Sequence, residues 1–195
     1  MRTRALATLT FLVACPSTQT LDGPDAGDAI DDAGTVDATP PSRVCDVRDF
    51  GAAGDGVTKD TMAIQAAIDA CADAGGDAVV TLRDGIYLSG TIRLAAGLTL
   101  DVAPTAVLRG SQNPADYPEL SPPFENTQLG NCRRALVYAE RADGVRITGG
   151  GTVDGNARGV PDWNGNRIRE ALRPIAIFVT ASRGVTIDDL DVNDA

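Results

Sequence analysis

The chain has 195 residues, a formal net charge of −10 and no histidine. This length suits one domain of moderate size, and the acidic balance argues against nucleic acid as a partner. Without histidine these residues can form neither a histidine-based catalytic site nor a histidine metal site, and we expect no metal and no other cofactor.

The first twenty residues are typical of an export signal. Arg2 and Arg4 supply positive charge, and the mostly apolar stretch 5–14 is shorter than the about 20 residues of a membrane span. It ends in Leu-Val-Ala-Cys, which resembles a bacterial lipobox, so residues 1–15 are interpreted as a lipoprotein-type signal with Cys15 as the lipid anchor. The alternative is an ordinary cleaved signal in which this cysteine is incidental.

Residues 16–42 are predicted to form a disordered acidic linker. The segment is rich in Asp, Ala, Gly, Thr and Pro, and it has too few large apolar residues to offset its ordering entropy. Such a spacer would hold a folded domain away from a membrane to which the chain attaches through its lipid only. We therefore expect an exported protein, either an outer-membrane lipoprotein or an extracellular protein.

A strand-like segment at 44–47 leads into a glycine-rich turn at 49–56 and then into a helical pattern at 59–72. Apolar residues of the helix recur at spacings of three and four, namely Ile64, Ala67, Ile68 and Cys71. Asp60 is expected to accept hydrogen bonds from the first helical turn, and Gly75 and Gly76 to end the helix. This amphipathic helix is suited to cover one open end of an all-β body.

From Asp77 onward the apolar period changes to two, which predicts short strands separated by turns. The first are expected at 78–82, 91–94, 98–100 and 106–108. A glycine followed by alternating apolar and polar residues begins three later units, at 97–101, 144–148 and 184–188. Each unit is followed by a second short strand, at 106–108, 152–154 and 190–192, and the last two units are preceded by approach strands at 136–139 and 176–179.

This repeat is typical of a parallel β-helix, in which inward apolar side chains of each coil stack on the next. Leu88, Leu98 and Leu108 are expected to fill the coil. The alternative is a β-sandwich, which is disfavoured because no clear hairpin turn separates successive strands. Two polar insertions, 111–134 and 156–173, lengthen the units, and insertions in repeat proteins collect on one face that often binds a ligand.

Several short motifs resemble a known family. The turn and helix at 49–68 carry Asp-Phe-Gly-Ala, Gly-Asp-Gly, Asp-Thr, Ala-Ile-Gln and Ala-Ile in an order that resembles the opening of the pectate-lyase-like β-helix superfamily. The segments 85–90, 106–111, 116–118, 151–156 and 173–174 are similar to polygalacturonases, the pectin hydrolases of glycoside hydrolase family twenty-eight. The resemblance implies an all-β, right-handed parallel β-helix over 43–195, incomplete in this chain, with an N-terminal amphipathic cap helix.

The resemblance also implies inverting hydrolysis of galacturonan, with aspartates as general acid and as base. In the family these aspartates lie in motifs that follow the segment matching 188–195, so we expect no catalytic residue in this chain. It would then be the N-terminal, non-catalytic part of a pectin-degrading glycoside hydrolase. The alternatives are a non-catalytic polysaccharide-binding β-helix, such as a surface adhesin or tailspike-like module, and a lyase or epimerase of the same superfamily.

Three segments imitate the missing catalytic motifs. Asp188 and Asp189 are interpreted as a solvated strand edge whose adjacent side chains point to opposite faces. The family has its catalytic aspartates in Asn-Thr-Asp and Asp-Asp motifs, followed by Gly-His-Gly and Arg-Ile-Lys. The segment 193–195 reads Asn-Asp-Ala and is not Asn-Thr-Asp. Arg-Ile-Arg at 167–169 is similar to Arg-Ile-Lys but is interpreted as a basic loop, because it lies too early in the chain.

Arginines concentrate in or beside the two insertions, at Arg133, Arg134, Arg158, Arg167, Arg169 and Arg173. A guanidinium group matches the carboxylate of a uronate polymer, and a tryptophan can stack on a sugar face. Trp163, Arg167 and Arg173 are therefore the substrate-cleft candidates, for galacturonan or another glycan. The alternatives are a general bias towards arginine, since Lys59 is the only lysine, and packing of Trp163 within its own loop.

Four cysteines separate into different roles. Cys45 and Cys71 are predicted to form a disulfide, because the turn folds the lead-in strand and the helix end back on one another in an exported protein. Cys132 is left either free or paired with a cysteine outside this chain.

Overall fold

The computed structural model describes residues 43–73, 77–123, 133–160 and 173–194. The predicted signal, Cys15 and the linker lie outside the described residues, as do Gly75, Gly76, Cys132, Trp163 and Arg167. Among the described residues, no helix has the length and apolar character that crossing a membrane requires.

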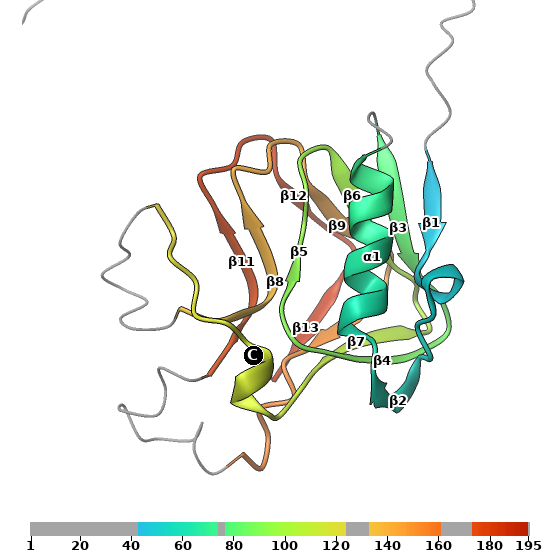
Figure 1. Cartoon of the computed structure of the whole chain (residues 1–195), viewed down its shortest axis with the longest axis vertical. Coiled ribbons are helices and arrows are strands. Elements are labelled where there is room, and N and C mark those ends of the chain that lie inside the picture. Colours follow the sequence, from blue (N-terminus) through green and yellow to red (C-terminus); the bar gives the residue numbers. More distant parts are fainter. Residues whose placement is uncertain (1–42, 74–76, 124–132, 161–172, 195) are drawn as a thin grey trace, which may run out of the picture. The chain divides into compact units, whose positions relative to one another are not determined.

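The described residues form three parallel sheets with one α-helix against them (Figure 1). The first sheet runs in the order β1 (Val44–Asp46), β3 (Ala78–Leu82), β6 (Leu98–Val102), β9 (Arg146–Thr148) and β12 (Thr186–Ile187). The second sheet holds β2 (Asp55–Lys59), β4 (Gly85–Ser89), β7 (Ala106–Gly110), β10 (Thr152–Asp154) and β13 (Asp191–Asn193). The third sheet holds β5 (Ile92–Arg93), β8 (Ala135–Glu140) and β11 (Ile175–Thr180).

From β3 onward, successive strands visit the three sheets in turn, whereas in the first coil α1 stands between β2 and β3. Every strand pairs in parallel with its counterpart one coil away. The predicted parallel β-helix is therefore confirmed. Apolar side chains stack in register down its interior, as in Tyr87, Leu108 and Val153, which are fully buried. In the last coil the corresponding Ile187 and Val192 are 48% and 46% exposed, because no further described coil covers them.

The prediction that Leu88 fills the coil is wrong. Leu88 is only half-buried, whereas its neighbour Tyr87 is completely buried. Strand β4 begins at Gly85 and places Tyr87 and Ser89 inward, so alternation turns Leu88 outward. Leu98 and Leu108 are buried as predicted.

Helix α1 (Thr61–Ala72) covers the first coil and contacts β1, β3 and β5 (Figure 1). The predicted stripe of Ile64, Ala67, Ile68 and Cys71 is the buried face of this helix. Cys71 forms the predicted disulfide with Cys45, with the two Cα atoms 6.2 Å apart, and so joins the helix to β1.

Asp60 precedes the helix, but the expectation that its side chain caps the first turn is wrong. The Asp60 carboxylate is 1% exposed and accepts hydrogen bonds from the backbone N–H groups of Ala53 at 2.7 Å and Gly54 at 3.0 Å. These two bonds hold the glycine-rich turn against the start of α1. They also satisfy the carboxylate, which would be costly to bury without hydrogen bonds.

Candidate functional site

Both insertions leave and rejoin the β-helix at the same corner. The first starts after β7 and the second after β10, which are neighbours with Arg109 opposite Asp154. They return at β8 and β11, which are neighbours with Ala135 opposite Ile175. We call the described residues 111–123, 133–134, 156–160 and 173–174 the insertion corner. Its topology agrees with the expectation that both insertions lie on one face.

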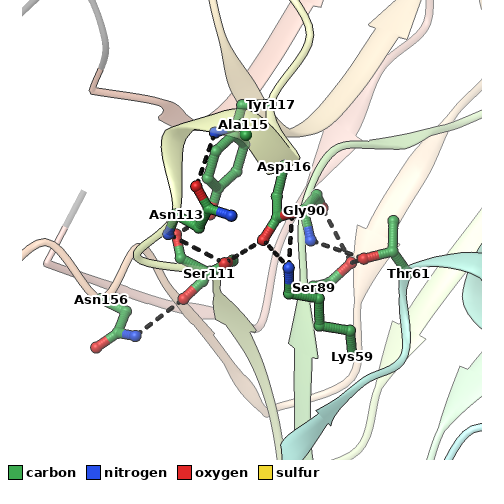
Figure 2. Close-up of polar contacts among 11 residues, drawn as sticks. Lys59, Thr61, Ser89, Gly90, Ser111, Asn113, Ala115, Asp116, Tyr117 and Asn156 are labelled. Atoms are coloured by element: carbon green, nitrogen blue, oxygen red, sulfur yellow. Dashed lines mark hydrogen bonds and ion pairs between the residues drawn. The ribbon is translucent and has the colours of Figure 1, made fainter.

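A polar cluster around Asp116 fixes the first insertion to the β-helix (Figure 2). The Asp116 carboxylate accepts a hydrogen bond from Lys59 Nζ at 2.7 Å and another from Ser111 Oγ at 2.5 Å. Asp116 belongs to the short helix η2 (Pro114–Asp116), and its carbonyl accepts from Thr91 N at 3.2 Å. Burial opposes ionisation of the Asp116 carboxyl, but the bonds from Lys59 and Ser111 outweigh it and lower the pKa below its usual value.

Two glycines allow η2 to approach the strands. A Cβ atom at Gly90 would lie 2.3 Å from the carbonyl oxygen of Asp116, and one at Gly110 would lie 2.8 Å from the hydroxyl oxygen of Tyr117. Tyr117 is fully buried and donates to the carbonyl of Ser111 at 2.8 Å, while burial and the charge of Asp116 raise the pKa of its phenol. These glycines of the 85–90 and 106–111 motifs are thus explained by packing.

The beginnings of the two insertions are tied to each other. Asn156 Nδ2 donates to the carbonyl of Gly110 at 2.9 Å (Figure 2), and Gln112 Nε2 donates to the carbonyls of Asn156 at 3.1 Å and Arg158 at 3.3 Å. These bonds join side chains of one insertion to backbone at the start of the other. Hydrogen bonds therefore link the starts of the two insertions across neighbouring coils.

The structure separates the arginines of this corner by their partners. Arg134 donates its guanidinium N–H groups to the carbonyls of Pro114, at 3.3 Å, and of Tyr117, so its role is to hold η2. Arg158 forms an exposed ion pair with Asp194 at 3.1 Å.

Arg133 and Arg173 differ from those two residues. Each is half-buried, and neither has an acidic partner among the described residues. Each also lies two residues before its strand, at Ala135 or Ile175, which pair with each other. Of the substrate-cleft candidates only Arg173 is described, and it lies at the insertion corner.

Asp188 and Asp189 follow β12 in a bend and do not occupy strand positions, so the expected strand alternation does not apply to them. Asp188 forms an ion pair with Arg146 at 2.7 Å, and Asp189 has a left-handed backbone with φ of 45°. The described residues contain no group of three or more His, Cys, Asp or Glu side chains placed to hold a metal ion.

The third sheet carries a row of side chains that sequence reasoning missed. Arg93, Tyr138 and Phe178 are register partners in successive coils, with the Arg93 guanidinium 5.3 Å from the Tyr138 ring centre and the two rings 5.6 Å apart. Tyr138 donates to Glu140 at 2.7 Å, and burial, followed by this bond, raises its pKa to about 12. The sequence signal that could have revealed this row is that a cationic or aromatic residue follows an apolar residue at the same register position in all three strands.

A comparison with known families and proteins agrees with this architecture. A family model described as rhamnogalacturonase A/epimerase, pectate lyase-like, matches residues 44–109. An exo-poly-alpha-D-galacturonosidase of Dickeya chrysanthemi is 32% identical over 142 residues, covering 69% of this chain and 23% of the relative. The mannuronan C5-epimerase AlgE6 of Azotobacter vinelandii is 46% identical over 63 residues, covering 23% of this chain and 7% of the relative.

Two solved structures share the fold. A family 28 exopolygalacturonase of Yersinia enterocolitica aligns with a TM-score of 0.62 and 24% identity, covering 77% of this chain and 35% of its own. The surface adhesin PfbA of Streptococcus pneumoniae aligns with a TM-score of 0.54 and 23% identity, covering 76% of this chain and 32% of its own. The chain thus spans less than a quarter of the first relative's length and about a third of each structure.

Proposed function

Because the described residues form a polygalacturonase-like parallel β-helix, we propose that this chain is the N-terminal, non-catalytic part of an inverting hydrolase of pectin and polygalacturonate. The observation that carries the proposal is the insertion corner, where two neighbouring coils bring together Arg133 and Arg173, which pair with no acidic side chain of the described residues. Similarity to an exo-poly-alpha-D-galacturonosidase over 69% of the chain supports an acidic galacturonan as the ligand.

The chain would bind and orient the polymer but would not cleave it. Inverting hydrolysis requires an acid and a base about 6.5–9.5 Å apart. Asp188 is engaged by Arg146, and Asp116 is engaged by Lys59 and Ser111. We assign the catalytic aspartates to a part of the protein outside this chain.

We also propose that the protein is exported and anchored through a lipid on Cys15. The motivation is the Leu-Val-Ala-Cys segment after a short basic and apolar start. Mass spectrometry of the mature N-terminus tests this proposal. An acylated Cys15 would support it, and an unmodified start at another residue would contradict it.

The second candidate is a protein that binds or epimerises a polyuronate without cutting it. This candidate is favoured by a stretch of 63 residues that is 46% identical to a mannuronan C5-epimerase. Both candidates share the carboxylate-rich ligand, so a binding assay alone does not separate them.

The test is product analysis with the complete gene product on polygalacturonate and on mannuronan. Hydrolysis of polygalacturonate releases reducing ends without forming a double bond, a lyase forms an unsaturated uronate, and an epimerase changes the sugar configuration without shortening the chain. New reducing ends without unsaturation support our proposal. As a control, Asp188→Asn with Asp189→Asn should leave that activity unchanged, and its loss would mean that this pair is catalytic.

A further inference from the structure

We infer that the Asp55 side chain is an edge lock on β2, which prevents the last described coil of a second copy from adding to the first coil. Without this lock, copies of the chain would stack head to tail, and the contact would repeat at every free end. The inference concerns assembly and goes beyond the proposed function, because it does not depend on the substrate.

Strand β2 is the outermost strand of the second sheet. Among the described residues it pairs only with β4, and four of its five residues are exposed, including Val57 at 80%. Val57 and Thr58 are of the residue types that favour strands. A regular strand here would therefore offer another chain a row of unpaired N–H and C=O groups.

The Asp55 side chain takes up the donors of this edge. Its Oδ1 accepts from Val57 N at 2.8 Å and from Thr58 N at 2.7 Å, and its Oδ2 accepts from Thr58 Oγ1 at 2.8 Å. Successive N–H groups of a regular strand point to opposite sides, so two that reach one oxygen cannot belong to a regular ladder. The bond from Val57 N, followed by the bond from Thr58 N, lowers the pKa of the Asp55 carboxyl and so favours its acceptor-only form.

The backbone of β2 bulges at the same place. Asp55 is the register partner of Ile86, and Lys59 is that of Leu88, so the three residues between Asp55 and Lys59 face a single residue of β4. Gly56 has a φ of 78°, which glycine adopts without strain. A bulge turns an edge away from regular pairing, and the Asp55 carboxylate holds the backbone in this shape.

The opposite end of the same sheet supplies the strand that the lock excludes. Strand β13 ends the order of the second sheet, and its Val192 is 46% exposed. All strands of this sheet are parallel, so a second copy stacked on the same axis would present β13 to β2 as a further parallel strand. Such a heterologous contact leaves one end free at each step and generates filaments.

The experiment follows the assembly of the full chain by sedimentation velocity over a range of concentrations. Hydrogen exchange at the Val57 and Thr58 amides is measured on the same samples. The test variant is Asp55→Ala, which removes both acceptor oxygens. The matched control is Asp55→Asn, which removes the charge but keeps Oδ1, the oxygen that both amides bind.

A further variant combines Asp55→Ala with Ile187→Lys and Val192→Lys, which places charges on the last described coil. Asp55 is exposed, so its replacement should leave the core intact. Thermal unfolding checks that every variant remains folded.

Asp55→Ala should form species larger than a dimer, with a size that grows with concentration, whereas the wild type should form none. The amides of Val57 and Thr58 should exchange about fivefold faster in Asp55→Ala, as expected for the loss of an ordinary hydrogen bond. Asp55→Asn should match the wild type in both measurements. The combined variant should form no large species, because charged side chains oppose pairing at strand edges.

An unchanged size distribution in Asp55→Ala would overturn the edge lock, and so would large species in the wild type. Equally large species in Asp55→Asn would also overturn it, because the cause would then be a lost charge repulsion. Large species that persist in the combined variant would exclude the last described coil as the partner. None of these results affects the proposed hydrolase function, which product analysis tests separately.

Discussion

Asp60 is a buried carboxylate whose two hydrogen bonds hold the glycine-rich turn. Ala53 N and Gly54 N donate to different oxygens of Asp60, so replacing it by Asn keeps one bond and places an NH2 group against the other backbone N–H. We therefore expect Asp60→Asn to lower the free energy of unfolding by about 1–3 kcal/mol. Urea denaturation measures the loss. Asp73→Asn is the control, because Asp73 is exposed at the other end of the helix, and an equal loss in both variants would contradict this role.

Asp116 makes the insertion corner sensitive to acid. Its pKa is lower in the folded chain than in the unfolded chain, where Asp has a pKa of about 3.9. The resulting stability is present above that value and disappears as the pH falls through the lower folded-state pKa. We therefore expect the loss of stability between pH 5 and pH 2 to be smaller in Asp116→Asn than in the wild type, measured by urea denaturation at each pH. An identical loss in both proteins would contradict the prediction.

At the scale of elements, α1 closes the edge of the third sheet through one side chain. Gln65 Oε1 accepts from Arg93 N at 2.8 Å, and Gln65 Nε2 donates to the carbonyl of Arg93 at 3.2 Å. The amide group thus makes the bonds that a further strand would make with β5. Unpaired strand edges invite association with other chains, so this contact protects the covered end of the β-helix.

Gln65→Leu should leave Arg93 without these bonds. We expect a loss of about 1 kcal/mol in the free energy of unfolding and faster hydrogen exchange at the Arg93 amide. Asp69→Asn is the control, because it alters the contact of Gln65 within the helix and leaves the bonds to Arg93 in place. An unchanged exchange rate at Arg93 in Gln65→Leu would show that the contact does not protect the edge.

The disulfide joins α1 to β1 across a sequence separation of 26 residues. A loop of this length predicts that replacing Cys45 and Cys71 together by Ala lowers the free energy of unfolding by about 3–4 kcal/mol. Denaturation of both proteins tests this, with Cys132→Ser as the control. A loss below about 1 kcal/mol would mean that α1 packs as firmly without the bridge.

At the scale of the whole described β-helix, the two ends differ. Helix α1 and Gln65 cover the first coil, whereas Ile187 and Val192 of the last described coil are about half exposed. We expect the 195-residue chain in isolation to self-associate through this last coil, because apolar side chains and unpaired strand edges lie together there.

Sedimentation velocity tests this expectation. Ile187→Lys with Val192→Lys should reduce the association. Val57→Lys should not, although Val57 is an apolar residue with 80% exposure at the other end. A wild-type chain that stays monomeric at all concentrations would contradict the expectation.

The sequence predicted the coils because stacking requires an apolar residue at every second position of a strand. That alternation recurs in the units at 97–101, 144–148 and 184–188. It did not predict strand β4, where Tyr87 and Leu88 are both apolar and only the register decides which one points inward. The place of the insertions was predictable from length and polarity. The hydrogen-bond partners of Asp60, Gln65 and Arg134 were not predictable. Gln65 and Arg134 bind backbone groups that are far away in sequence, and Asp60 binds a turn whose shape the sequence does not reveal.

The insertion corner also has a practical consequence. Each insertion starts and finishes on rungs that pair with the neighbouring coil, and Gly110 and Asn156 link their starting points. The parts of the insertions that make no contact with the coils can therefore be exchanged as a cassette. Asp116, Tyr117 and Leu120 of the first insertion have to stay, because they bond to or pack against the coils. Loops from other proteins of this fold could be grafted there to change which polymer is recognised, provided that the side chains anchoring both starting points are retained.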